Sequence, residues 1–398
     1  MLYRLRKFDY QAYLVGGSVR DLLLGRLPKD FDIGTSARPG EVKRIFRNCW
    51  IIGRRFRLAH VKFGQKTIEV ATFRRQLPPD ELAAAEAADR KAEAAQKEGG
   101  EKVTRRLIRQ ENTFGSAEED ASRRDFTVNA LFYDIANFSV IDYVGGMDDL
   151  RAGLIRSIGD PNERFIEDPV RMLRALALSV RLDFQLDTPV QRAIKRHKAE
   201  ISKASPARMI EELYKILRSG FAESIFRSLS DYGLLELIAP EVERRKTQAL
   251  WRSLEVLDAY RRRFEATPAT LTNPILLGIL VQPVQPLDLT PRRRDDKSPI
   301  DVTLGKLPIA RRDIERLRQA LQIQPRLQDP GLTPRAQRAV VHRGAFNDAV
   351  TWLDVNGHDP DSLQRWKIFV DAGEPVRSPA KRRHRRPRRR KRRNTTKN

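Results

Sequence analysis

Hydrophobic and polar positions at the start of the chain follow a strand-and-turn pattern. An apolar run at residues 12–15 ends at Gly16-Gly17, and apolar residues at helical spacing then continue as far as Gly25. This order predicts a strand, a tight turn and a short helix that is capped by Ser18.

Strict alternation of polar and apolar positions marks two further segments, residues 30–33 and 67–72. Side chains two positions apart share one face of a strand, so both segments are predicted to be strands with an acidic face. Two more β-rich runs lie between residues 131 and 143, just before Gly145-Gly146. This part of the chain is therefore predicted to hold a mixed β-sheet.

From Pro169 onward, apolar residues recur three and four positions apart, and strand patterns nearly vanish. That spacing predicts helices that each bury one face. The predicted fold class is α+β, with a mixed-sheet head followed by an all-α neck and body. The predicted boundaries are a head at 1–146, a neck at 147–235, a body at 236–375 and a tail at 376–398.

Two segments lack the pattern of a packed core. Residues 79–111 interleave alanine with charged residues and carry no aromatic residue, which predicts a mobile, partly helical insertion in the head. Residues 379–393 are low-complexity basic sequence, which predicts a disordered arm.

The net positive charge is large, and basic residues are in excess both in the predicted tail and in the rest of the chain. The chain has 76 Lys and Arg against 52 Asp and Glu, a formal net charge of +24. Residues 376–398 carry Lys and Arg but no acid, yet the rest of the chain is also clearly basic. An excess of this size predicts a polyanionic partner, with nucleic acid ahead of acidic lipid.

Two features that the sequence lacks bear on the cellular compartment of the protein. The single cysteine, Cys49, excludes an intrachain disulfide, and no apolar run approaches the roughly 20 residues that cross a bilayer. These features predict a cytoplasmic protein without a membrane partner.

The acidic pair Asp30 and Asp32 is the first candidate for chemistry. On one strand face the two carboxylates repel each other unless a cation neutralises them. Hard oxygen ligands favour Mg²⁺ or Mn²⁺. An Asp-x-Asp pair by itself is more often a solvated strand face, and its position behind a Gly-Gly turn gives it weight.

The turn at Gly16-Gly17 is the second candidate. Glycines leave backbone N–H groups open, and the following helix directs its positive end to the same place, which predicts a phosphate site with Arg20 as a further contact. The sequence has no P-loop motif and lacks the third glycine of a dinucleotide fingerprint. A phosphate site beside metal-binding acids predicts a nucleoside triphosphate site.

Four motifs in order resemble those of the class II nucleotidyltransferases, within the polymerase-β-like superfamily. They are G-G-S-V-R-D at 16–21, D-F-D at 30–32, R-R-D-F-T-V-N-A at 123–130 and E-D-P-V-R-M-L-R at 167–174. The family contains tRNA CCA-adding enzymes and bacterial poly(A) polymerases. The run I-G-R-R-F-R-L-A-H-V from Ile52 and the Arg-rich tail are closer to the polyadenylating members.

The resemblance implies a two-metal reaction in which an RNA 3′-hydroxyl attacks the α-phosphate of ATP. Asp30 and Asp32 would hold the metals. Two residues compete as the third carboxylate: Asp125 matches the family motif and is preferred, whereas Glu69 lies on a strand that faces the aspartate pair and is the reserve.

The resemblance also assigns nucleotide contacts to Gly16, Gly17, Arg20, Arg124, Asp168, Arg171 and Arg174. Asp168 and Arg171, three positions apart on one expected helix, would read the amine-and-acceptor edge that adenine and cytosine share. The same spacing also suits a simple intrahelical ion pair. This pair alone does not separate A-addition from C-addition.

One position departs from the family pattern. Ala177 stands where an arginine is common, and Arg181, on the same side of the helix, is the candidate substitute. Three functions stay open: template-independent AMP addition from ATP to RNA 3′ ends, which we rank first; CCA addition to tRNA; and RNA binding by a protein whose nucleotidyl site has decayed.

Overall fold

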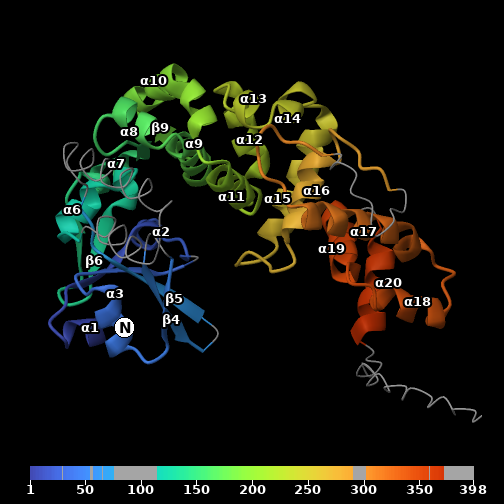
Figure 1. The fold of residues 1–398 in the computed structure, drawn as a ribbon, viewed down its shortest axis with the longest axis horizontal. Coiled ribbons are helices and arrows are strands. Elements are labelled where there is room, and N and C mark those ends of the chain that lie inside the picture. Colours follow the sequence, from blue (N-terminus) through green and yellow to red (C-terminus); the bar gives the residue numbers. More distant parts are fainter. Residues whose placement is uncertain are drawn as a thin grey trace, which may run out of the picture.

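A computed structural model describes residues 1–28, 30–53, 57–64, 66–75, 114–289, 302–357 and 359–371. The predicted insertion at 79–111 and the predicted tail at 376–398 lie outside these residues. Within them the chain forms an arch, with the head at one end, α10 near the top and α17 to α20 at the other end (Figure 1).

The head is built on a seven-stranded sheet with the order β3-β4-β5-β2-β1-β6-β7. Only β2 and β5 pair in parallel among these neighbours. The strands are β1 (Ala12–Val15), β2 (Asp32–Thr35), β3 (Cys49–Ile52), β4 (Leu58–Phe63), β5 (Lys66–Thr72), β6 (Leu131–Asp134) and β7 (Ser139–Asp142). The head helices are α1 (Leu2–Arg6), α2 (Gly17–Leu23), α3 (Pro39–Ile45), α6 (Ala117–Ser122), η1 (Thr127–Asn129) and α7 (Gly146–Ala152).

The sheet has a core on each face, as the alternation along β1 shows. Ala12 belongs to a cluster with residues of α1 and α3, and Val15 belongs to a cluster with residues of α6. Because side chains alternate along a strand, one short apolar run supplies both faces. The predicted strands at 12–15, 67–72 and 131–143 are confirmed.

The strand predicted at 30–33 begins later than expected, at Asp32. Val15, the last residue of β1, pairs with Asp32 in antiparallel register, and the turn at Gly16 then takes β1 away. Asp30 has no partner strand on that side and precedes the sheet. The prediction that Asp30 and Asp32 lie on one strand is therefore wrong.

The remaining elements are nearly all helical, which confirms the α+β class. They are β8 (Leu154–Ile155), α8 (Pro161–Glu167), α9 (Val170–Leu182), β9 (Gln185–Leu186), α10 (Thr188–His197), η2 (Lys198–Lys203), α11 (Pro206–Leu217), α12 (Ala222–Asp231), α13 (Leu235–Ile238), α14 (Pro240–Arg244), α15 (Gln248–Arg262), α16 (Asn273–Val281), α17 (Arg311–Gln328), α18 (Pro334–Val341), α19 (Phe346–Asn356) and α20 (Pro360–Asp371).

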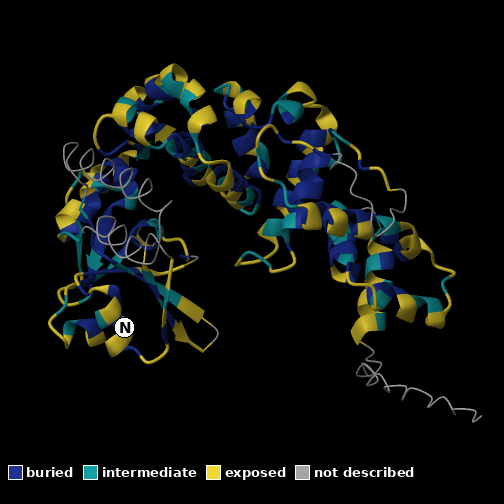
Figure 2. Cartoon of the chain, in the orientation of Figure 1, coloured by how far each residue is buried: buried dark blue, intermediate teal, exposed yellow. Residues whose placement is uncertain are grey.

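One hydrophobic core joins the head to the helices. It runs from Val19 and Phe126 in the head through α9 to α17. Helix α16 lies deep inside it and is dark blue over most of its length in Figure 2. This core crosses the predicted boundaries at 146 and 235, so it packs the head against helices α9 to α12. The division into domains stays a prediction.

Candidate active site

A cavity of about 590 Å³ lies between the head and the helices. Its head wall includes the turn at Gly16 and the start of β2, and its helical wall is formed by α9, α11 and the start of α12. The predicted site residues that line it are Gly16, Gly17, Arg20, Asp32, Arg124, Asp125, Asp168, Arg171 and Arg174. Motifs that span about 160 residues of sequence thus meet at one cavity.

The acidic side of the site is centred on Asp32. Its neighbour in the parallel β2–β5 register is Glu69. Loss of hydration raises the pKa of Asp32, the charges of Glu69 and Asp30 raise it further, and only Arg124 opposes them. Asp30 does not line the cavity itself, but its charge reaches Asp32.

These carboxylates fit a divalent cation only in combination with a substrate. Among the described residues, no group of three or more His, Cys, Asp or Glu is tight enough to hold a metal ion alone. Mg²⁺ is commonly held by one or two carboxylates together with substrate phosphates. Mutually repelling oxygen donors beside a cavity lined by arginines match that arrangement.

The two candidates for the third carboxylate have different surroundings. Glu69 is the neighbour of Asp32 in the strand register, and its charge raises the pKa of Asp32. Asp125 is buried, accepts a hydrogen bond from the backbone N–H of Phe126 at 2.9 Å, and forms an ion pair with Arg174 at 2.7 Å. The register therefore supports Glu69 as a neighbour of Asp32, whereas Asp125 is the one of the two that lines the cavity. The catalytic role of each stays a prediction.

The turn between β1 and α2 depends on Gly16. Its φ is +72°, and a Cβ atom there would lie 2.9 Å from Nη1 of Arg124, so a side chain meets both backbone strain and an arginine. The cap of α2 is Gly16, and the prediction of a Ser18 cap is wrong. Ser18 is the second residue of α2, and its hydroxyl donates to the carbonyl of Val15 at 3.0 Å.

Arg20 is buried and fully engaged with the protein. Its guanidinium donates to Asp21, with Nε at 2.9 Å and Nη2 at 2.6 Å from Oδ1, and Nη1 donates to the side chain of Asn129. A phosphate contact from Arg20 would have to compete with these bonds.

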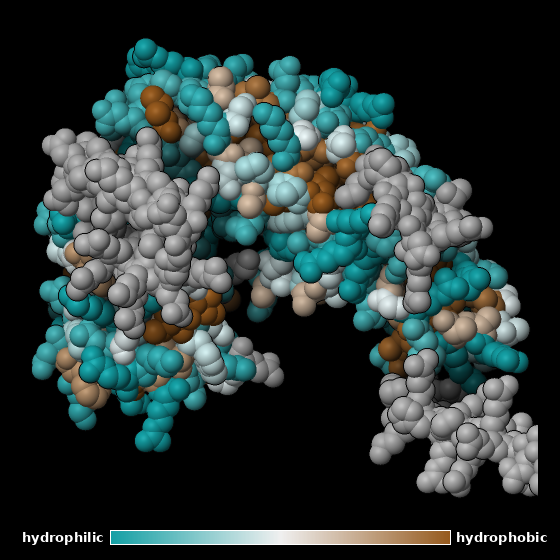
Figure 3. Space-filling model, viewed as in Figure 1, coloured by the Kyte–Doolittle hydropathy of each residue, from teal (hydrophilic) through white to brown (hydrophobic). Residues whose placement is uncertain are grey.

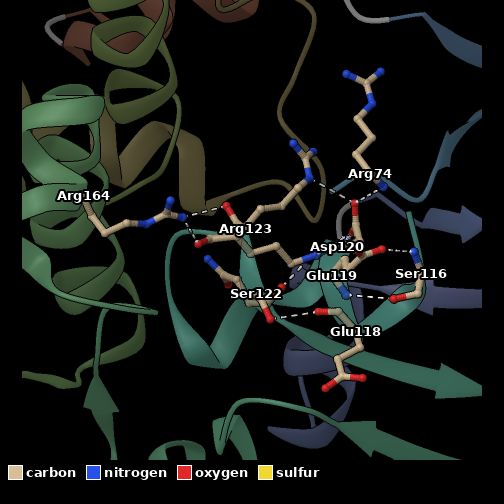
Figure 4. Close-up of polar contacts among 10 residues, drawn as sticks. Arg74, Ser116, Glu118, Glu119, Asp120, Ser122, Arg123 and Arg164 are labelled. Carbon is tan, nitrogen blue, oxygen red and sulfur yellow. Dashed lines mark hydrogen bonds and ion pairs between the residues drawn. The ribbon is translucent and has the colours of Figure 1, made fainter. Parts of the chain in front are cut away.

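Sequence reasoning missed two residues that position the Arg123-Arg124 motif. The carboxylate of Asp120 accepts from Nε of Arg123 at 3.2 Å and from Nη2 of Arg124 at 3.0 Å (Figure 4). From α8, Nη2 of Arg164 donates to the carbonyl oxygens of the same two residues at 2.7 and 2.6 Å. The spacing of Asp120 was a usable helical signal, whereas Arg164, 40 residues away, left none.

Asp168 and Arg171 do not share a helix, which corrects the prediction. Pro169 follows Asp168, and a proline disfavours helical backbone at the residue before it. Helix α8 accordingly ends at Glu167, Asp168 has φ −141° and ψ 91°, and Arg171 belongs to α9. Both residues still line the cavity.

The two residues are ion-paired to other partners rather than to each other. Asp168 accepts from Arg208 of α11 at 2.7 Å. Nη1 of Arg171 donates to Glu167 at 2.7 Å and to the carbonyl of Arg164 at 3.0 Å. These contacts hold a carboxylate acceptor and a guanidinium donor at the cavity wall.

Ala177 and Arg181 of α9 also line the cavity. Among the described cations of the wall, Arg181 is the one whose side chain has no hydrogen-bond or ion-pair partner. Partial desolvation and the charge of Arg20 lower the pKa of its guanidinium, the charge of Asp21 opposes them, and Arg26 lowers the pKa further. A guanidinium without a direct partner in this place is suited to an anionic ligand.

Comparison with known proteins identifies the family. Residues 12–156 match the poly(A) polymerase head domain, and residues 183–245 match the probable RNA- and SrmB-binding site of polymerase A. Poly(A) polymerase I of Salmonella typhi is 46% identical over 248 residues, which is 62% of this chain and 50% of that protein. The chain belongs to the class II nucleotidyltransferase family.

Other members of the family are similar over different extents. Poly(A) polymerase I of Haemophilus influenzae is 41% identical over 68% of this chain and 55% of its own length. The CCA-adding enzyme of Bacillus licheniformis is 33% identical over 63% of this chain and 57% of its own length. The chain thus spans about half the length of the curated relatives it matches.

A solved structure extends the likeness to nearly the whole chain. The Bacillus stearothermophilus CCA-adding enzyme in complex with CTP aligns with a TM-score of 0.61 and 25% identity, covering 93% of this chain and 80% of that one. The expected fold class is thereby confirmed. No helix in the described ranges is long and apolar enough to span a membrane.

Proposed function

We propose that the protein adds AMP from ATP to the 3′ end of RNA without a template. The observation that carries this proposal is the cavity itself, which brings Asp32 opposite the cations and the Asp168–Arg171 pair of the helical side. The similarity to poly(A) polymerases I favours adenylate as the group transferred.

The proposed reaction combines a nucleotidyl transfer, a divalent metal ion and the side chains that bind the metal and the phosphates. The 3′-oxygen of RNA bonds to the α-phosphorus of ATP as the bond to pyrophosphate breaks, and the hydroxyl proton is released. Mg²⁺ or Mn²⁺, when bound, would stabilise the charges on the attacking and leaving oxygens. Asp32, with Asp30 and Glu69 nearby, would supply the protein oxygens of that site, and Arg174, Arg124 and Arg181 would face the phosphates.

Base selection is proposed to fall to Asp168 and Arg171. A carboxylate accepts from the exocyclic amine of adenine, and a guanidinium donates to the adjacent ring nitrogen. The ion pair of Asp168 with Arg208 and the hydrogen bond that Arg171 donates to Glu167 fix the orientations of these two groups before a nucleotide binds. Guanine and uracil present a carbonyl in place of the amine and are excluded.

CCA addition is the second candidate, and the likeness to the CTP-bound CCA-adding enzyme is the observation that favours it. The protein is incubated with a generic RNA or with a tRNA that lacks its CCA end, with Mg²⁺ and with each nucleotide separately or with CTP and ATP together. Long A-tails on the generic RNA support the proposal. Addition of C and then A to the tRNA alone supports the second candidate, and RNA binding without extension supports a decayed site.

Arg181 is expected to contribute to ATP binding. Arg181→Gln should raise the KM for ATP by about tenfold or more, because a charge-assisted hydrogen bond is worth roughly 1.5–3 kcal/mol. Steady-state kinetics measure the effect. Arg192→Gln, on the exposed face of α10, is the matched control. A KM for Arg181→Gln equal to that of the control would remove Arg181 from the site.

The basic tail is proposed to hold RNA electrostatically, on the strength of its sequence. Deleting residues 379–398 should weaken RNA binding and flatten its salt dependence, because each phosphate contact to a single strand adds about −0.7 to the salt slope. Extension in a single turnover should persist. Filter binding at several salt concentrations tests this, and an unchanged slope would exclude the tail from RNA binding.

A further inference from the structure

The helical wall of the cavity continues beyond it to a corner at the end of α15. Ser219, just after α11, lines the cavity. The next residue, Gly220, has φ +84°, and a Cβ atom there would lie 3.3 Å from Cγ of Arg261. Nη1 of Arg262 donates to the carbonyl of Gly220 at 3.2 Å. The corner, defined as Arg261–Phe264, is therefore in direct contact with the cavity rim.

The corner combines an exposed aromatic ring with consecutive arginines. Phe264 is 40% exposed, and its ring centroid lies 5.3 Å from that of the buried Tyr260. Nη1 of Arg261 donates to the carbonyl of Phe264 at 2.6 Å, which fixes the backbone that carries the ring. The guanidinium of Arg263 also lies over the Phe264 ring, 5.9 Å from its centroid, and the side chain still remains open to solvent.

The positive charge of the corner is only partly neutralised. Arg263 pairs with Asp354 at 2.9 Å and lies over the ring of Tyr260. Arg261 and Arg262 donate to backbone carbonyls, and neither has an ion pair with another described residue. A carbonyl positions a guanidinium without cancelling its charge, so the corner attracts anions.

The corner lies on the inner side of the arch. Figure 1 shows the chain after α15 projecting toward the head, and the space-filling view shows the molecule hollowed between the head and the body (Figures 1 and 3). Phe221, which is 38% exposed, adjoins Gly220 between the cavity and the corner. A ligand that leaves the cavity past Ser219 would therefore be close to two exposed aromatic residues and to arginines.

We propose that this corner is a stacking platform for the single-stranded segment of RNA behind the 3′ end. Bases stack on exposed aromatic rings irrespective of sequence, and guanidinium groups contact the phosphates between them. A chain of repeating bases and phosphates is the ligand that uses both features of the corner at once. The proposal rests on the proposed function for the assumption that an RNA 3′ end enters the cavity.

Binding of oligo(A) of two lengths to the full chain, without ATP, tests the platform. The trinucleotide is chosen as the length expected to occupy the cavity alone, and the dodecanucleotide as the length expected to reach the corner. Phe264→Leu keeps an apolar side chain but removes the ring, and should weaken binding of the dodecanucleotide by about 5- to 100-fold without affecting the trinucleotide. Phe264→Trp should bind like the wild type, since it keeps an aromatic face.

The control for the ring is Phe138→Leu, because Phe138 is 71% exposed in the turn between β6 and β7. Equal affinities for Phe264→Leu and the wild type at both lengths would overturn the platform, as would equal losses for the Leu and Trp variants. In that case a protein partner would become the better occupant of the corner.

The contribution of the arginines is tested separately, through the salt dependence of RNA binding. Arg262→Gln should reduce the magnitude of the slope of log affinity against log salt by about 0.7 for the dodecanucleotide. Arg44→Gln, at an exposed position of α3 in the head, is the control and should leave the slope unchanged. An unchanged slope for Arg262→Gln would contradict the phosphate contact.

The platform and the proposed function fail in distinguishable ways. Extension of the trinucleotide by ATP reports on the chemistry alone. Normal extension with no effect of Phe264→Leu on binding overturns the platform only. No extension by the wild type, with a clear effect of Phe264→Leu on the dodecanucleotide, overturns the proposed function only.

Discussion

Replacing Asp32 with asparagine is expected to stop nucleotide transfer, with kcat lowered by about a thousandfold or more. Stabilisation of transition-state charge at such a site is worth several kcal/mol, and each 1.36 kcal/mol is tenfold in rate. Single-turnover extension of RNA with ATP measures the loss. Asp148→Asn, an exposed acid on α7, is the control and should retain full activity.

The same substitution is expected to leave the fold intact or to stabilise it. Partial desolvation and the charges of Glu69 and Asp30 raise the pKa of Asp32, so ionised Asp32 costs the folded state free energy at neutral pH. That cost is present above the raised pKa and disappears as the pH falls below the ordinary value of about 3.9. The Tm of Asp32→Asn should therefore equal or exceed that of the wild type at pH 7, with the difference shrinking in acid.

Wild-type turnover by Asp32→Asn would refute the assignment of Asp32, and so the catalytic account. Loss of turnover together with a large fall in Tm would also count against it, since the geometry assigns Asp32 repulsive contacts rather than a packing role.

Glu69 and Asp125 are expected to behave differently when each loses its charge. Glu69→Gln should lower kcat by about a hundredfold or more and raise the Mg²⁺ concentration needed for half-maximal rate, because Glu69 interacts with Asp32. Asp125→Asn should instead change the KM for ATP, because it releases Arg174, with little change in the Mg²⁺ requirement.

Rates measured across Mg²⁺ and ATP concentrations distinguish these two effects. A Mg²⁺ requirement that shifts for Asp125→Asn and not for Glu69→Gln would restore Asp125 as the third carboxylate.

Local patterns predicted the parts of the structure that depend on neighbouring residues. The run at 12–15 and the glycine pair after it specify β1 and its turn, because alternation and glycine act within a few positions. The cap was misplaced because Gly16, with its positive φ, caps the helix two residues before Ser18. The break at Asp168 was also readable, since the proline that causes it is adjacent.

Long-range geometry was beyond the sequence pattern. That Glu69 and Asp32 are neighbours depends on the parallel register of β5 against β2, and no local rule specifies which strands pair. The contact of Arg164 with the carbonyls of Arg123 and Arg124 likewise requires α8 to pack against the head. The family motifs predicted which residues line the cavity. The residues that orient them could be identified only from the three-dimensional structure.

Affinity for Mn²⁺ in the presence of a non-hydrolysable ATP analogue tests the central claim most directly. Electron paramagnetic resonance of bound Mn²⁺ should show a tight site in the wild type and in Asp148→Asn, and a greatly weakened one in Asp32→Asn and Glu69→Gln. Wild-type Mn²⁺ affinity in Asp32→Asn would contradict the claim that these acids hold a metal over the triphosphate.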